Sequence, residues 1–223
     1  MPKRWIVWFL VAMALPLGTP RWGTASVSQL SGFEVTVDTS EVPDLAGWGR
    51  QAKELAQKWH PRIAKLLQSD GFTPPQKVTI VFKKSMRGIA YTRGTTIVIA
   101  ADWVRSHPDD FGMVIHELTH TIQGYRRGGP SWLVEGIADY VRFCHFEPET
   151  PVIVNPRRAS YRDGYRTTGR FLGWVEKTYD RDIVRQLNNS LRKGEYTDDL
   201  FQTYTSHSLD ELWADFVSSQ APK

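Results

Sequence analysis

Cysteine is almost absent from this chain of 223 residues, in which Cys144 is the only one. A single cysteine excludes an intramolecular disulfide, so the hydrophobic core, together with any bound metal, must hold the fold. A lone thiol can serve as a catalytic nucleophile, but packing as a small buried hydrophobic side chain is its ordinary role, and we interpret Cys144 in that way. The class of small disulfide-rich extracellular modules is excluded.

Long apolar runs are also scarce, and the one that exists lies at the N-terminus, where Trp5–Gly18 is free of charge for 14 residues. Two basic residues precede it, and the small residues Gly23 and Ala25 offer a cleavage site. The run is too short to cross a bilayer comfortably. We predict a signal peptide at residues 1–25, with an uncleaved anchor as the alternative. The mature protein is expected to be secreted or held in the cell envelope, without stable membrane insertion.

Excess positive charge is lacking once this segment is set aside. The whole chain has 28 Lys and Arg against 24 Asp and Glu, a formal net charge of +4. Removing Lys3, Arg4 and Arg21 with the signal peptide leaves 25 basic and 24 acidic residues. Pairs such as Arg126-Arg127 and Arg157-Arg158 are too short to form the basic stripe that a nucleic acid requires. We therefore expect no nucleic-acid partner.

Internal repeats and low-complexity tracts are missing as well, which is typical of a folded domain rather than of an array. Hydrophobic residues make up 41% of the chain and aromatic residues 12%, enough for one sizeable core. We predict a single domain over residues 26–223, and a monomer is the expected state.

Strand patterns fill the first part of this domain and helix patterns the second. Alternation of apolar and polar residues predicts strands at Phe33–Asp38, Val78–Phe82, Gly88–Tyr91 and Thr95–Ala101, of which the last two form a hairpin. Apolar residues at helical spacing predict helices at Pro43–Leu67 (with Pro61 as a kink or break), Ser106–Gly124, Ser131–Phe146, Tyr161–Tyr179, Arg181–Leu191 and Ser208–Ser218. The predicted fold class is α+β, with a small mixed or antiparallel sheet and a mostly helical C-terminal part.

One of these helix patterns is nearly free of charge. Phe111–Tyr125 reads FGMVIHELTHTIQGY, in which Glu117 is the only acidic residue and Lys and Arg are absent. His116 and His120 lie four positions apart, so on a helix their rings are offset by about 40° and converge on one side. Two neutral imidazoles are good zinc ligands, and the glutamate beside the first can act as general base toward the attacking water. The segment predicts a helix that carries one catalytic Zn²⁺.

The next predicted helix offers two carboxylates for the third ligand that a catalytic zinc ion normally takes. In Trp132–Val141 the charged residues are Glu135 and Asp139, which are four apart and therefore share a helix face. Such a face is either solvated or turned toward the metal. The shortage of other charges on both helices, and the short Gly-rich turn between them, favours the metal. The residues alone leave open which carboxylate binds it.

This arrangement resembles the gluzincins, the thermolysin-like metallopeptidases, in which HExxH is followed by E-x-x-x-D on a downstream helix. The resemblance implies a zincin-like fold in which His116, His120 and Glu135 hold the zinc ion. It also implies that Glu117 is the general base and that Asp139 orients a ligand histidine. In the alternative, Asp139 is the ligand and Glu135 supports it, as in metallopeptidases with an aspartate as third ligand.

Three sequence blocks together carry a closer resemblance. They are HELTHxxQ at His116–Gln123, EGIADYVR at Glu135–Arg142 and YxxGYxxTGRFL at Tyr161–Leu172. In order and spacing they resemble the basic secretory protein family of plants and bacteria, whose members are regarded as zinc peptidases, and the resemblance spans roughly Phe33–Leu200. Gly169 stands where we would expect Ala, a change expected mainly to loosen the helix. The nearly neutral mature chain also departs from the family's name.

Two tyrosines complete the predicted site. Tyr161 and Tyr165 lie four apart at the start of a predicted helix and would face one way. A phenol can donate a hydrogen bond to the oxyanion that forms on an attacked carbonyl, and we assign this role first to Tyr165 and second to Tyr161. Packing in an amphipathic core is the alternative. By analogy with zincins, the strand Thr95–Ala100 is expected to be the sheet edge that pairs with an extended substrate.

The sequence therefore predicts a secreted zinc-dependent peptidase that hydrolyses a peptide or protein substrate, with Glu117 as general base. Two alternatives stay open. One is a zinc hydrolase that acts on another amide or ester, such as a cell-wall peptide, and the other is a secreted zinc-binding domain without hydrolytic activity. The presence of Glu117 disfavours the second, because a purely structural zinc site needs no base.

Overall fold

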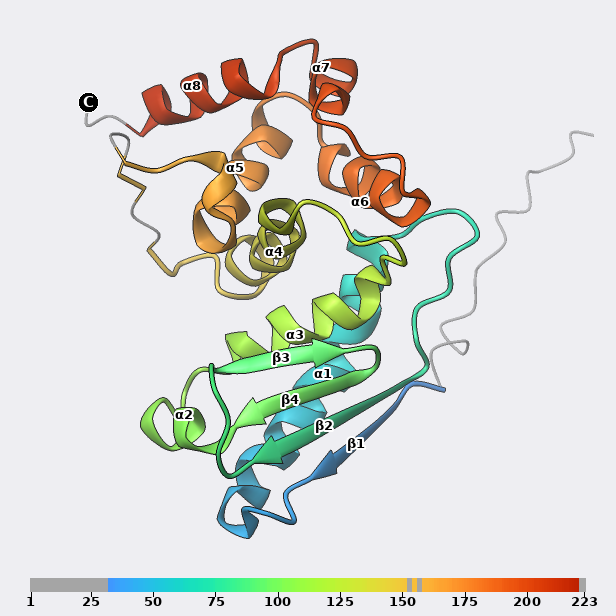
Figure 1. Cartoon of the computed structure of the whole chain (residues 1–223), viewed down its shortest axis with the longest axis vertical. Coiled ribbons are helices and arrows are strands. Elements are labelled where there is room, and N and C mark those ends of the chain that lie inside the picture. Colours follow the sequence, from blue (N-terminus) through green and yellow to red (C-terminus); the bar gives the residue numbers. More distant parts are fainter. Residues whose placement is uncertain (1–31, 152–153, 156–157, 221–223) are drawn as a thin grey trace, which may run out of the picture. The chain divides into compact units, whose positions relative to one another are not determined.

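The computed structural model describes residues 32–151, 154–155 and 158–220, and the predicted signal peptide at residues 1–25 lies outside them. A four-stranded sheet is formed by β1 (Glu34–Asp38), β2 (Lys77–Lys83), β3 (Ala90–Arg93) and β4 (Thr96–Ala100). The strand order is β1-β2-β4-β3, in which β1, β2 and β4 are parallel and β3 is antiparallel to β4 (Figure 1). The small mixed sheet of the predicted α+β class is confirmed.

The expectation that Thr95–Ala100 would form the open edge of the sheet is wrong. β4 lies between β2 and β3, so both of its sides are paired. Its apolar residues Ile97 and Ile99 have no exposed surface, as is usual for a central strand. The hairpin instead turns β3 outward, and β3 becomes the edge strand, with residues that alternate between half-buried and exposed.

Helix α1 (Ala46–Leu66) follows a single 3-10 turn, η2 (Pro43–Leu45), and covers one face of the sheet (Figure 1). Its buried residues include Trp59 and Ile63. Pro61 lies inside the helix without ending it, so the predicted break does not occur. A proline in this position removes one backbone hydrogen bond, and burial of its apolar neighbours against the core offsets that loss.

The connection from the sheet to the next long helix differs from the prediction. Helix α2 (Ala101–Ser106) follows β4 directly, and α3 (Gly112–Gln123) begins after a short turn. Ser106, where the predicted helix was expected to begin, is instead the last residue of α2, and its hydroxyl donates to carbonyls of that helix. The carboxylate of Asp110 accepts a hydrogen bond from a backbone N–H in the first turn of α3. Gly124 ends α3 as predicted, with a φ of 60° that glycine adopts without strain.

The C-terminal part is mostly helical, as predicted. It contains α4 (Ser131–Tyr140), the π-helical turn η3 (Val141–Phe146), α5 (Tyr165–Thr178), α6 (Ile183–Lys193), α7 (Asp199–Thr205) and α8 (Leu209–Ser219). Helix α7 was not predicted, because seven residues are too few to show a helical period. Figure 1 shows α4 to α8 gathered beyond α3, on the side away from the sheet. Within the described ranges, no helix has the length and apolar character needed to cross a membrane.

Helices α4 and α5 contact each other where both carry glycine. A Cβ on Gly136 of α4 would lie 2.3 Å from Cγ2 of Thr168, and a Cβ on Gly169 of α5 would lie 2.7 Å from the carbonyl carbon of Asp139. Gly169 therefore does more than loosen its own helix: it lets α5 touch the backbone of α4. This close contact holds the segment of α4 that carries Asp139.

Candidate metal centre

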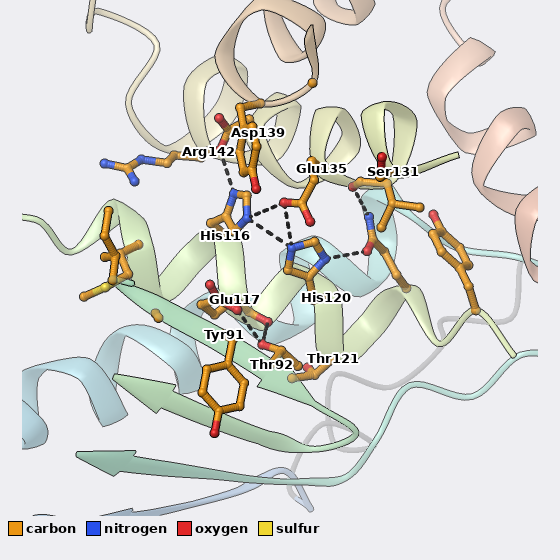
Figure 2. A pocket seen from close by; sticks show the side chains of 18 of the residues that line it. Tyr91, Thr92, His116, Glu117, His120, Thr121, Ser131, Glu135, Asp139 and Arg142 are labelled. Carbon is orange, nitrogen blue, oxygen red and sulfur yellow. Dashed lines mark hydrogen bonds and ion pairs between the residues drawn. The ribbon is translucent and has the colours of Figure 1, made fainter. Parts of the chain in front are cut away.

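Three side chains from two helices meet at one point. Helix α3 turns His116 and His120 toward α4, and α4 presents Glu135 to them (Figure 2). Nε2 of His116 is 3.0 Å from Nε2 of His120. Oε2 of Glu135 lies 3.1 Å from the first nitrogen and 3.3 Å from the second. We call these three donor atoms the ligand triangle.

The ligand triangle has the size that a small divalent cation requires. Ligands held tetrahedrally at about 2.0–2.1 Å from a zinc ion lie about 3.3–3.4 Å from one another, close to the separations observed. The side chains of His116, His120 and Glu135 are 12%, 17% and 27% exposed, so the triangle is open on one side. Two imidazole nitrogens, one carboxylate oxygen and an open side form the donor set of a catalytic zinc site. The residues fit such an ion.

Asp139 approaches His116 from the opposite side of the ring. Its Oδ1 is 2.6 Å from Nδ1 of His116, and the residue is only 4% exposed. A proton on Nδ1 donates to this carboxylate and leaves the Nε2 lone pair directed at the ligand triangle. The geometry therefore supports Glu135 as the third ligand and Asp139 as the residue that orients a ligand histidine.

His120 has an equivalent partner in Gln123, for which the sequence pattern predicted no role. Oε1 of Gln123, one turn further along α3, is 2.8 Å from Nδ1 of His120. The amide nitrogen of Gln123 donates in turn to the carbonyl of Val134 in α4, 2.9 Å away. Both histidines thus have the nitrogen outside the triangle fixed by a hydrogen bond. The spacing of three residues on one helix is the signal that could have revealed this pair.

The carboxylates also raise the pKa of His116. Burial lowers the pKa of His116, but its hydrogen bonds to Asp139 and Glu135 raise it by more, to about 9. Burial raises the pKa of Glu135, but hydrogen bonds from His116 and His120 outweigh this effect and lower it to about 2. The centre therefore stabilises a positive charge at the ligand triangle, either a proton or a metal ion.

Glu117 lies beside the ligand triangle without joining it. The residue is 6% exposed, and its Oε2 accepts a hydrogen bond from the hydroxyl of Thr92 at 2.7 Å. Figure 2 shows both side chains on the β3 side of the two histidines. The sequence does not reveal the role of Thr92, because nothing in the hairpin pattern indicates which strand will lie beside α3.

The two predicted tyrosines do not share a helix face, and that part of the prediction is wrong. Tyr161 lies in a separate 3-10 turn, η4 (Tyr161–Asp163), and Gly164 with a φ of 74° separates this turn from α5. The hydroxyl of Tyr161 donates to Asp210 at 2.9 Å, and its ring packs against Trp132. The ring and the hydroxyl of Tyr161 are therefore both engaged in contacts with the C-terminal helices.

Tyr165 lies beside the ligand triangle. Its ring is nearly parallel to that of His116, with centroids 6.1 Å apart and an angle of 15° between the planes. The residue is 56% exposed. Its backbone φ is 46°, and residues other than glycine adopt a positive φ only at a cost in conformational free energy. The charge of Glu135 raises the pKa of Tyr165, so its phenol keeps the proton that a hydrogen-bond donor needs.

Cys144 takes no part in this centre. It is half-buried, and its Sγ lies 3.6 Å from the carbonyl oxygen of Gly169. Burial raises the pKa of the Cys144 thiol to about 11. A thiol with this pKa is protonated at neutral pH and is a poor nucleophile, in agreement with a packing role.

A cavity of about 1390 Å³ opens onto the ligand triangle. Residues of β3, α3, α4 and the start of α5 line it. The large hydrophobic residues that are exposed in the described part of the chain are Ile89 (41%), Tyr91 (49%) and Tyr165 (56%), and all three line this cavity. Exposed apolar residues gathered around one cavity are typical of a binding site.

The fold and the site together define an α+β protein with a candidate His-His-Glu metal centre, built on two successive helices at a cavity beside a sheet edge. The model of the family described as "Peptidase of plants and bacteria" matches residues 49–216. The chain belongs to this family, which confirms the resemblance carried by the three sequence blocks. No curated protein and no solved structure matches the chain.

Proposed function

We propose that this protein is an exported, zinc-dependent peptidase. The observation that carries the proposal is the position of Glu117, a buried carboxylate beside the ligand triangle that lines the same cavity and takes no part in the triangle. A structural zinc site usually fills all four positions with protein ligands and needs no such base. Membership of a peptidase family supports the same reaction.

Each part of the centre has its own chemical task in this proposal. The ligand triangle holds a zinc ion, which when bound polarises a carbonyl and makes water a better nucleophile at neutral pH. Glu117 accepts a proton from the attacking water and passes it to the leaving amine, so the peptide bond is broken without a covalent intermediate. The phenol of Tyr165 donates a hydrogen bond to the oxyanion. Asp139 and Gln123 keep the histidine rings in place.

The substrate in this proposal is an extended peptide that pairs with β3. The N–H of Ala100 donates to the carbonyl of Ile89 at 2.9 Å. Because hydrogen-bonded and non-hydrogen-bonded pairs alternate along an antiparallel ladder, the main-chain groups of Ala90 and Thr92 point away from β4, to the free edge. A peptide added there is recognised by backbone hydrogen bonds. The exposed Ile89 and Tyr165 offer contacts for its apolar side chains. The edge role first expected of Thr95–Ala100 is thus assigned to β3.

Export is supported by the sequence of residues 1–25, with its basic start, apolar run and small residues before Ser26. The protein is then secreted or held in the cell envelope. Mass spectrometry of protein recovered outside the cytoplasm tests this part separately. An N-terminus at or near Ser26 is expected, and an intact N-terminal segment would indicate an anchor instead.

A peptide-library digest that includes cell-wall peptides, combined with metal analysis, tests the reaction. The purified protein should hold about one zinc ion per chain and cleave peptides. Glu117→Gln should keep the zinc ion but abolish cleavage, because it removes only the base. Glu195→Gln, at an exposed glutamate outside the cavity, is the matched control and should behave like the natural protein.

The outcomes separate the alternatives. A folded protein without metal would reject the site, and cleavage by Glu117→Gln at the natural rate would reject the base. Zinc binding without cleavage of any peptide would indicate a zinc-binding domain. Cleavage restricted to cell-wall peptides would indicate the alternative of a zinc hydrolase specific for such peptides.

A further inference from the structure

We propose that Thr92 is a positioning residue that links the binding of the peptide strand to the orientation of the general base. Its side chain holds the carboxylate of Glu117, while its main chain faces the free edge of β3. The inference rests on the proposed function and adds to it a residue that neither the HExxH motif nor the second helix contains.

The side-chain contact is short and specific. Oγ1 of Thr92 lies 2.7 Å from Oε2 of Glu117 and 2.9 Å from the main-chain oxygen of the same residue. A hydroxyl has one hydrogen to donate, and the bond to an ionised carboxylate is the stronger of the two. Among the described residues, Thr92 is the only hydrogen-bond partner of this carboxylate. Because Glu117 is buried, the bond is little weakened by solvent.

The strand geometry explains why Thr92 can make this contact. Side chains alternate along β3: Tyr91 and Arg93 are exposed, whereas Ala90 and Thr92 are half-buried. The half-buried residues face α3, as the bond from Thr92 to Glu117 shows. A β-branched side chain in a strand has few χ1 rotamers, so the hydroxyl is held in direction before substrate arrives.

The main chain of Thr92 points to the place where a substrate strand would add. Thr92 is opposite Ile97 in the β3–β4 ladder, two residues beyond the Ala90–Ile99 pair, and both are non-hydrogen-bonded positions. A peptide paired with the N–H and C=O of Thr92 would therefore bind to the residue whose side chain holds the base. A shift of the edge strand would move the peptide and the carboxylate together.

Loss of the hydroxyl should affect turnover more than binding. Thr92→Val keeps the shape, the strand propensity and the main-chain groups, but leaves Glu117 without its hydrogen bond. A base that is free to rotate is misplaced for much of the time, and a displacement of about 1 Å can cost roughly 100-fold in rate. We expect kcat to fall ~10–100-fold while KM changes by less than about threefold. Thr92→Ser, which retains the hydroxyl, should restore most of the rate.

The experiment compares these two variants with Thr36→Val and with Glu117→Gln, in steady-state cleavage and in zinc affinity. Thr36 is the matched control, because its hydroxyl also makes a hydrogen bond within the sheet, to Thr79 at 3.0 Å, but away from the cavity. Zinc affinity should be the same in all four variants.

The result that supports the inference is a loss of kcat in Thr92→Val, absent from Thr36→Val and rescued by Thr92→Ser. Natural kcat in Thr92→Val, an equal loss of kcat in Thr36→Val, or a failure of Thr92→Ser to restore the rate would overturn it. If Glu117→Gln itself turns over normally, the proposed function fails and this inference fails with it. If Glu117→Gln loses activity but Thr92→Val keeps the natural kcat, the proposed function stands and the role of Thr92 is rejected.

Discussion

The imidazole of His116 lies between two carboxylates of the same helix, with Asp139 2.6 Å from Nδ1 and Glu135 3.1 Å from Nε2. The spacing of four residues places both carboxylates on one face of α4, but the ring separates their positions. Only Glu135 also approaches His120, at 3.3 Å. The two acids therefore have different surroundings although their sequence pattern is symmetrical.

Zinc affinity should distinguish the two acids. Glu135→Ala removes a ligand and should abolish tight binding, whereas Asp139→Ala removes a hydrogen bond to a ligand and should weaken binding ~10–100-fold. Competition with a chelator of known affinity measures both, with Asp109→Ala as control at an exposed carboxylate. Equally small effects in the two variants would show that neither residue is a ligand.

Tyr165→Phe and Tyr161→Phe should differ in kind. Tyr165→Phe removes a donor beside the ligand triangle and should lower kcat by roughly 100-fold, as loss of an oxyanion donor does. Tyr161→Phe removes the hydrogen bond to Asp210 and should leave kcat unchanged, with a loss of about 0.5–1 kcal/mol in the free energy of unfolding. Steady-state kinetics and urea unfolding measure the two effects. A larger loss of kcat in Tyr161→Phe would reverse the assignment.

Gly169→Ala should destabilise the protein although alanine favours helices. Its Cβ would lie 2.7 Å from backbone atoms of Asp139 and Tyr140, which cannot move aside as a flexible side chain can. We expect a loss of about 1–3 kcal/mol in the free energy of unfolding, together with weaker zinc binding because α4 is displaced. Gly47→Ala is the control: its Cβ would meet only Arg50 at 3.8 Å, and a gain of about 0.5–1 kcal/mol is expected. A gain in both variants would show that α4 and α5 can separate without cost.

His60 should make stability fall at acid pH. The residue is 3% exposed, stacks on Phe33 and has no hydrogen-bond partner at either ring nitrogen among the described residues. Burial lowers the pKa of His60, against a weaker opposing effect of the Pro75 backbone. Below the ordinary pKa of 6.5, the imidazole therefore binds a proton in the unfolded chain but stays neutral to a lower pH in the native state. Its contribution to stability is full above that pH and is lost as the pH falls below it.

Urea unfolding of the zinc-loaded protein on both sides of pH 6.5 measures this effect. His60→Leu removes the ionisable group, so its stability should depend less on pH in this range than that of the natural protein. An identical pH dependence in the two proteins would show that His60 does not contribute. The comparison cancels the titration of the other histidines, which both proteins share.

Local periodicity explains the parts of the fold that were predicted correctly. His116 and His120 converge because one helix turn separates them, a property of the helix itself that needs no tertiary contact. The same holds for Glu135 and Asp139 on α4, and for Gly124, whose left-handed conformation ends α3. These features depend on residues within a few positions of each other, so the local sequence determines them without tertiary contacts.

The remaining features depend on contacts between distant segments. β3 rather than β4 became the sheet edge because β4 buries its apolar residues between two neighbours. Tyr161 and Tyr165 separated because Gly164 breaks the helical pattern and Asp210 binds the first hydroxyl.

The sequence by itself determined a helix with two candidate metal ligands, two candidate acids on the next helix, and the family to which the chain belongs. Tertiary structure decided which acid faces the ligand triangle, which strand borders the cavity, and that the hydroxyl of Thr92 reaches Glu117 across 25 residues of chain. The reason is physical: the direction of a side chain follows from its own helix or strand, whereas its partner depends on how those elements pack.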